Sequence, residues 1–197
     1  MANLFSIHSV GDSIIQYLRN AYPQDLRDAH PCEFRIVSSG ELAEDTDEFN
    51  TTLTLYLYRV IVNEHVRNRP PARMSRDAKA PLSVDLHFMM SIWADSASAE
   101  HTICAWAMRQ LHDHPIMDNS SLTEDGGWLP DDVVHIIPAE LSNEDMMRIW
   151  DAIAPYYRLS ISYIARVVRI DPEDASHGQP VVATRFEYGE REGGNNG

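Results

Sequence analysis

The clearest pattern of hydrophobic and polar positions runs from residue 82 to residue 115. Between Leu82 and Trp93, hydrophobic residues alternate with more polar ones, and a period of two is typical of a half-buried strand. One face is expected to carry Leu82, Val84, Leu86, Phe88, Met90 and Ile92, and the other Ser83, Asp85, His87, Met89, Ser91 and Trp93. After Asp95 and Ser96, both good N-caps, hydrophobic residues recur at helical spacing until Pro115. The sequence therefore predicts one long strand that leads directly into one long helix.

Other segments also have the periodicity of a helix or a strand. Helices are predicted over residues 7–21 and 142–154, and strands over 32–38, 51–62, 133–137 and 158–170. The second of these helices has a clear start, because Ser142 and Asp145 have the spacing of a capping box. In strand 51–62, Arg59 falls on an otherwise hydrophobic face. Either that end of the strand leaves the core, or Arg59 reaches a carboxylate there.

The segments between these elements are predicted to be loops. Residues 39–48 are acidic, residues 68–81 contain three prolines, and residues 117–131 contain a pair of glycines. The proline-containing segment cannot form regular structure and is expected to be an exposed, mobile connection between two antiparallel strands. Beyond residue 171, the pattern allows one further edge strand over 180–186, followed by a disordered tail.

The order of these elements, without an internal repeat, favours one α+β domain. We assign residues 1–171 to this domain and residues 172–197 to a C-terminal extension. The sheet is expected to be largely antiparallel, with the helices packed mainly on one of its faces.

Three blocks of the sequence resemble the cap, or tail-terminator, proteins of phage-tail-like contractile injection systems. The blocks are Leu55–Asn68, Leu82–Pro115 and Leu141–Asp171, which cover about half of the chain and follow the order found in that family. The resemblance implies a tail-terminator-like fold that corresponds to the N-terminal domain of the cap protein. Members of the family often continue well beyond this domain, whereas only a short segment follows Asp171 here.

The resemblance also implies a structural function. A member of this family is expected to assemble as a six-fold ring on the distal upper end of the inner tube and sheath. There it would stop polymerisation and stabilise the end of the particle. Its partners would be further copies of itself together with the tube and sheath proteins. Such a homohexamer is not an enzyme, and it needs no catalytic residue, metal or cofactor.

Composition narrows the class of protein further. The chain has 197 residues, 44% of them hydrophobic, and no stretch approaches the ~18 consecutive apolar residues of a membrane span. Its start lacks the basic region and long apolar core of a secretory signal, so synthesis in the cytoplasm and no membrane insertion are expected. The formal net charge of -14 argues against nucleic acid as a main partner. Cys32 and Cys104 lack a CxxC spacing, and we expect no disulfide.

The charges are unevenly distributed along the chain. Acidic residues crowd positions 41–48, and basic residues crowd positions 67–79. Opposite blocks suit head-to-tail contacts between copies of a subunit, but solvated loops are an equally good interpretation. The candidate assembly contacts are Arg67, Arg69, Arg73 and Arg76, which would bind acidic surfaces of a neighbour or of the tube and sheath, and Trp128, an aromatic anchor in a glycine-rich loop.

Three histidines near one another in the sequence are a candidate metal site. His101 and His112 are eleven positions apart, hence roughly three helical turns, which is too far for a compact set of ligands. His112 and His114 are expected to point to different sides. We therefore favour a polar helix end, where histidines lie close to the negative end of the helix dipole.

A hydrolytic triad of Ser83, Asp85 and His87 is a second candidate site. These residues share the more polar face of strand 82–93, but no nucleophile-elbow motif accompanies them. A solvated sheet face is the favoured interpretation. The alternatives to a cap are therefore a small metal-dependent or hydrolytic enzyme, or a soluble adaptor that binds a partner through the strand near Val181.

Overall fold

Six strands form one sheet in the computed structural model of the chain, which describes residues 2–44, 49–63, 81–153 and 156–172. In chain order the strands are β1 (Glu33–Val37), β2 (Thr52–Val62), β3 (Leu82–Trp93), β4 (Ile116–Met117), β5 (Val134–Pro138) and β6 (Ser160–Ile170). Across the sheet the order is β1-β2-β3-β6-β5-β4. Only the β1–β2 pair among these strands is parallel, so the prediction of a largely antiparallel sheet is confirmed.

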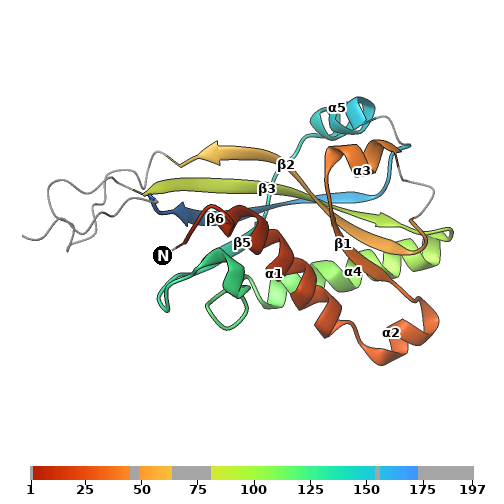
Figure 1. Ribbon diagram of the computed structural model, residues 1–197. Coiled ribbons are helices and arrows are strands. Elements are labelled where there is room, and N and C mark those ends of the chain that lie inside the picture. Colours follow the sequence, from red (N-terminus) through yellow and green to blue (C-terminus); the bar gives the residue numbers. More distant parts are fainter. Residues whose placement is uncertain (1, 45–48, 64–80, 154–155, 173–197) are drawn as a thin grey trace, which may run out of the picture.

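The helices cover the two faces of the sheet unequally. They are α1 (Ser6–Ala21), α2 (Gln24–Ala29), α3 (Ser39–Glu44), α4 (Ala97–Asp113) and α5 (Asn143–Ile153), with a short 3-10 helix η2 (Glu124–Gly126). The two long helices, α1 and α4, lie on one face, and the shorter α3 and α5 lie on the other (Figure 1). The predicted α+β class, with helices mainly on one face, is therefore confirmed, and α3 and α5 add a smaller layer on the opposite face.

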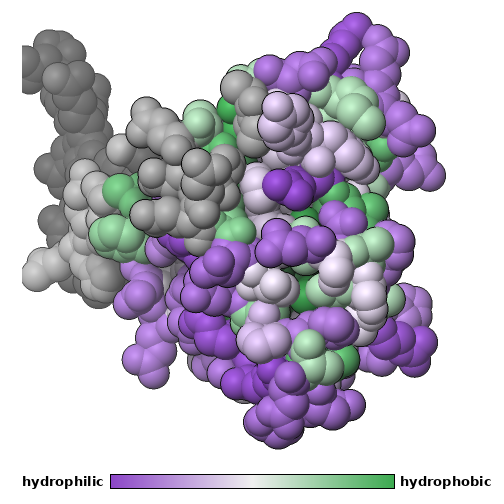
Figure 2. All heavy atoms as spheres, turned by 90° about the vertical axis from the view of Figure 1, so that its right-hand side faces the viewer, coloured by the Kyte–Doolittle hydropathy of each residue, from purple (hydrophilic) through white to green (hydrophobic). Residues whose placement is uncertain are grey.

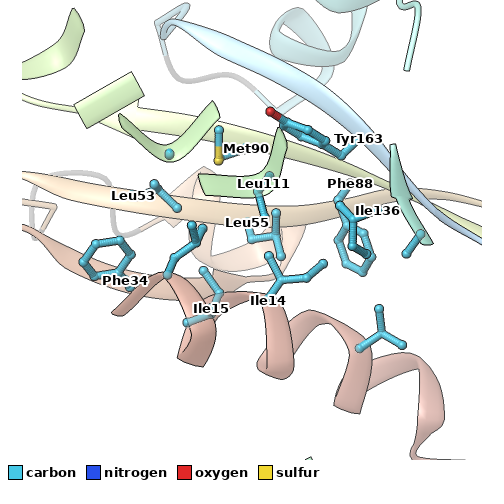
Figure 3. Packing of buried hydrophobic residues seen from close by; sticks show 14 of the residues in the cluster. Ile14, Ile15, Phe34, Leu53, Leu55, Phe88, Met90, Leu111, Ile136 and Tyr163 are labelled. Carbon is cyan, nitrogen blue, oxygen red and sulfur yellow. The ribbon is translucent and has the colours of Figure 1, made fainter. Parts of the chain in front are cut away.

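The main core lies between the sheet and the two long helices (Figure 3). Its buried residues include Val10, Ile14, Leu18, Phe34, Leu53, Leu55, Leu86, Phe88, Met90, Ile103, Leu111, Ile136 and Tyr163. Helix α1 packs directly against the sheet at Gly11, where a Cβ atom would lie 3.4 Å from the Phe88 ring and from Ile36 Cδ1. The helical stripe and the alternating strand of the sequence thus bury their hydrophobic side chains against each other, which is the main driving force for folding.

A second core lies on the opposite face of the sheet. Its buried residues are Val37, Leu42, Phe49, Met89, Trp93, Trp150 and Ile153. The indole N–H of Trp93 donates to Thr54 Oγ1 at 2.9 Å, and the guanidinium of Arg158 lies 4.9 Å from the centre of the Trp93 ring. The polar face of β3 was predicted to be solvated, and this prediction is wrong because α3 and α5 cover one end of it.

The acidic segment 39–48 was predicted to be a loop, but residues 39–44 form α3. A capping box explains the difference. The Ser38 N–H donates to Glu41 Oε2 at 2.7 Å, and the Glu41 N–H donates back to Ser38 Oγ at 3.3 Å. The bond from the Ser38 N–H also lowers the pKa of the Glu41 carboxyl group. Leu42 is then buried in the second core, so packing stabilises a helix that is too short to form alone.

A β-bulge in β2 explains the position of Arg59. Leu57 pairs with Phe88 and Arg59 pairs with His87, so Tyr58 is an extra residue that reverses the alternation of faces. Arg59 therefore lies on the same face as His87, away from the main core, and its side chain is exposed. Neither strain nor a buried carboxylate is needed to accommodate this charge.

Candidate assembly surfaces

The end of the sheet where β2 finishes and β3 begins is the first candidate surface. Val62 pairs with Val84, and Leu82 pairs with Ile170, so the ends of β2 and β6 and the start of β3 lie side by side. The chain start lies at the same end, because the Asp171 N–H donates to the Ala2 carbonyl at 2.9 Å (Figure 1). The segment with the predicted contact arginines follows β2, and the C-terminal extension follows β6, so both begin at this end of the sheet.

The outer edge of β2 is open over half of its length. β1 pairs with Thr52 to Tyr56, and no strand in the described part of the chain pairs with the outer edge of Leu57–Val62. Val60 and Val62 are 46% and 50% exposed, and Leu82 on the neighbouring strand is 47% exposed. Unpaired backbone groups flanked by exposed β-branched residues readily accept a strand from another chain.

A cluster of polar side chains fixes the residue at which β2 leads into the basic segment. The Asn63 N–H donates to the Ser83 carbonyl at 2.8 Å, and Asn63 Nδ2 lies 3.1 Å and 3.2 Å from the two carboxylate oxygens of Asp85. Arg166 Nη2 lies 3.4 Å from Asp85 Oδ2. Asn63, which precedes the segment that contains Arg67, Arg69, Arg73 and Arg76, is thus held by the buried carboxylate of Asp85.

The same cluster gives no support to a hydrolytic triad. Ser83 and Asp85 are buried rather than solvated, and the hydrogen bonds of the Asp85 carboxylate in the described part of the chain go to Asn63 and not to His87. Removal from water lowers the pKa of His87, and the charge of Arg59 lowers it further, although Asp85 acts in the opposite direction. Burial and the nearby charges of Arg59 and Arg166 therefore favour the neutral form of the His87 ring.

This environment predicts a pH dependence of stability that can be assigned to His87. The folded protein binds the His87 proton more weakly than the unfolded chain does, so the stabilisation is complete above the unfolded pKa of about 6.5 and is lost as the pH falls below it. Lowering the pH from about 7.5 to about 5.5 should reduce the free energy of unfolding more in the natural protein than in His87→Gln. Urea unfolding at both pH values measures this difference, and an equal loss in the two proteins would contradict it.

Trp128, the predicted aromatic anchor, is half-buried against the main core. Its indole N–H donates to Ser9 Oγ at 2.9 Å, and the same hydroxyl lies 2.7 Å from Thr123 Oγ1. Trp128 also lines a hollow of about 290 Å³, together with Val133 and Arg169. Its packing within the chain is therefore established, and a contact with another protein stays a prediction.

The serines of α1 that hold this loop were missed in the sequence. Ser9 and Ser13 are buried, and the Thr123 N–H donates to Ser13 Oγ at 2.8 Å. The signal was their spacing, since residues four apart lie on one side of a helix and these two lie beside the hydrophobic stripe of α1. The structure thus brings Trp128 next to α1, whereas the predicted arginines lie outside the described residues.

Comparison with known proteins decides the family. The model of the Pvc16 N-terminal domain matches residues 9–184, which is most of the chain. The chain belongs to the Pvc16 N-terminal domain family. A search of curated proteins found no match to the sequence.

Solved structures with the same fold come from contractile injection systems. The structure of the sheath/tube terminator in its extended state, from the extracellular contractile injection system PVC, has a TM-score of 0.62 and 15% sequence identity over 96% of this chain and 65% of its own. The tube-terminating cap of the anti-feeding prophage has a TM-score of 0.60 and 14% identity over 91% of this chain and 60% of its own. This Pvc16 N-terminal domain thus spans less than two thirds of either solved chain, and the likeness establishes the fold.

The family match includes most of the surfaces described above. The open edge of β2, the Asp85 cluster and the Trp128 loop all lie within residues 9–184, and the match extends beyond residue 171 into the segment that was assigned to a C-terminal extension. The division of this Pvc16 N-terminal domain at residue 171 remains a prediction.

The histidines considered as metal ligands are exposed in this Pvc16 N-terminal domain. His101, His112 and His114 lie at the surface of α4 and its C-terminal end, and the His114 ring packs 5.4 Å from the ring of Tyr17. Within the described ranges, no group of three or more His, Cys, Asp or Glu side chains could hold a metal ion. Among the helices in the same ranges, none combines the length and apolar character needed to span a membrane.

Proposed function

We propose that this chain is a structural cap, or tail terminator, of a contractile injection system. It assembles as a closed homo-oligomeric ring of six copies on the distal upper end of the inner tube and sheath. The family assignment carries this proposal, supported by the shared fold with a sheath/tube terminator and a tube-terminating cap. The function is structural rather than catalytic and requires no cofactor.

A ring of this kind stops growth for a physical reason. An open tube end presents subunit surfaces that have no partner, and each added layer recreates the same surfaces. A ring made of a different protein binds that end but offers the next layer no matching surface. Synthesis and assembly take place in the cytoplasm, and the chain becomes a component of the particle.

The surfaces proposed for the contacts are at the end of the sheet. The open edge of β2 is suited to accept a strand of a tube or sheath subunit, and Val60 and Val62 provide hydrophobic contact beside it. Arg67, Arg69, Arg73 and Arg76 are proposed to bind acidic surfaces on the neighbour or on the tube and sheath. Trp128 is proposed to anchor a neighbouring protein at the hollow that it lines with Val133 and Arg169. Nucleic acid and the membrane interior are not proposed as partners.

Deletion of the gene tests the function. Particles from the deletion strain should carry overlong or ragged tubes with open upper ends, and the natural gene supplied in trans should restore a uniform length. Imaging of negatively stained particles measures the length distribution and the shape of the upper end. Capped particles of unchanged length in the deletion strain would overturn the proposed function.

A charge-reversal variant tests the contacts separately. Replacing Arg67, Arg69, Arg73 and Arg76 with glutamate should prevent restoration of tube length. The matched control is Arg148→Glu on α5, whose side chain is 72% exposed and which should restore length like the natural gene. Restoration by the four-fold variant would remove the arginines from the interface while leaving the cap function in place.

A further inference from the structure

Leu4 and Phe5 form an exposed hydrophobic pair that is held rigidly at the start of the chain. Their side chains are 62% and 66% exposed. The turn that presents them is fixed by Asn3, whose N–H donates to the Gly126 carbonyl at 2.9 Å and whose Nδ2 donates to the Asp125 carbonyl at 2.9 Å. The Phe5 N–H in turn donates to Asn3 Oδ1 at 2.8 Å. A large apolar pair that is fixed in water-exposed positions is characteristic of a binding surface.

A hydrophobic groove lies elsewhere on the molecule, between α4 and β5. Its volume is about 470 Å³, and its lining includes Met108, Leu111, Ile136, Ile137, Pro138 and Tyr163. Leu111, Ile136 and Tyr163 belong to the main core (Figure 3). They are buried and line the groove, so they form its floor. Met108 is 44% exposed and Pro138 is exposed, so the groove is open to a partner. This size is within the range of about 300–1,000 Å³ that is usual for binding pockets.

Acidic side chains lie beside the first feature, and one arginine lies at the rim of the second. Glu124 and Asp125 are exposed next to the Leu4–Phe5 turn. Arg109 and His112 lie at the groove, and the bond from Arg109 to Asp113 at 2.8 Å uses Nε. Arginine has terminal nitrogens in addition to Nε that can bind a second carboxylate. Figure 2 shows another end of the molecule, where hydrophilic residues predominate along the right and lower outline and hydrophobic residues lie in small areas between them.

We infer that the Leu4–Phe5 pair of one copy inserts into the α4–β5 groove of the next copy. This inference rests on the proposed function and names the contact that closes the ring. The pair and the groove are different surfaces of the same chain, and contacts between unlike surfaces generate rings when the rotation closes. Phe5 fills the groove over the floor of Leu111 and Tyr163, and the acidic residues of η2 face the basic rim.

Disulfide trapping in assembled particles tests this contact. In particles that carry Phe5→Cys together with Met108→Cys, mild oxidation should link successive copies into a ladder of covalent oligomers. The matched control is Phe5→Cys with Met147→Cys, because Met147 on α5 is 46% exposed and lies on the opposite face of the sheet. Single variants control for the natural Cys32 and Cys104. Mixed assembly of the two single variants should give linked dimers, because each link joins unlike surfaces of two copies.

The results separate this inference from the proposed function. A ladder with the Met108 pair and none with the Met147 pair supports the inference, and Phe5→Ser should then raise the concentration at which the ring dissociates by at least ten-fold. Rings on the particle without a Met108 ladder would overturn the inference and leave the cap function in place. A chain that does not co-purify with particles would overturn the proposed function and the inference with it.

Discussion

Replacement of Phe88 with alanine is expected to lower the free energy of unfolding by about 3–5 kcal/mol. Phe88 is 2% exposed in the centre of β3, where it pairs with Leu57 on one side and Tyr163 on the other. The backbone of α1 covers the Phe88 ring on the helical side of the sheet, because Gly11 lies against this ring. Strand backbones and a helix backbone cannot collapse into the space that the ring leaves, so the cavity remains and the loss should be near the top of this range.

Urea unfolding measures this loss, and Val60→Ala is the matched control. Val60 lies on β2 and is 46% exposed, so its truncation should cost about 1 kcal/mol or less. The two variants should unfold with similar slopes but different midpoints, since both retain the same overall fold. A loss at Phe88 no larger than the loss at Val60 would contradict the position of Phe88 in the core.

Gly126→Ala is expected to lower the free energy of unfolding by about 2–4 kcal/mol. A Cβ atom at this position would lie 2.6 Å from Trp128 Cε2 and 2.7 Å from Ser9 Oγ, and it would also meet Trp128 Nε1. The indole must therefore move away from α1 and lose its hydrogen bond to Ser9. The carbonyls of Asp125 and Gly126 also hold Asn3, so the turn before α1 should loosen as well.

Two measurements follow this change. The free energy of unfolding reports the loss of stability, and a red shift of the tryptophan emission reports the entry of water around Trp128. Gly40→Ala is the matched control, since the nearest atom to its new Cβ is Ser38 Oγ at 3.8 Å and alanine favours the helix by up to about 1 kcal/mol. Unchanged stability and emission in Gly126→Ala would show that Trp128 does not pack beside Ser9.

The elements that could be predicted from the sequence are those whose hydrophobic pattern repeats over several turns or several residue pairs. Strand β3 and helix α4 were predicted within about two residues of their bounds. Of the two candidate N-caps, Asp95 and Ser96, it is Ser96 that caps α4, with its Oγ accepting from the Ala99 N–H at 3.2 Å. Ser142 also caps α5, because its Oγ accepts from the Asp145 N–H at 3.1 Å, but the reciprocal bond of the expected capping box runs from the Ser142 hydroxyl to Asp145 Oδ2 at 2.7 Å. Signals of this kind depend on residues that are neighbours in the chain, so these elements can be predicted from the sequence before the tertiary fold is known.

The errors arise where distant segments decide the outcome. The polar face of β3 is partly covered because α3 and α5 bring Leu42 and Trp150 over Met89 and Trp93, and no alternation within β3 carries that information. The bulge at Tyr58 depends on pairing between two strands. The contact of Trp128 with Ser9 joins residues 119 positions apart. The arginines of the candidate interface were chosen by composition, and they lie outside the described residues.

The two outer edges of the sheet differ in their ability to continue it. On one side, β2 has an open edge over Leu57–Val62. On the other side, β4 consists of two residues, and prolines at positions 115 and 138 remove backbone N–H groups where that edge would extend. Within the described residues, the outer edge of β2 could therefore receive a strand along Leu57–Val62, whereas β4 is too short to template one. Hydrogen bonding passed from molecule to molecule would not continue past β4, so a partner strand on β2 would not by itself make the molecule a link in a continuous chain of strands.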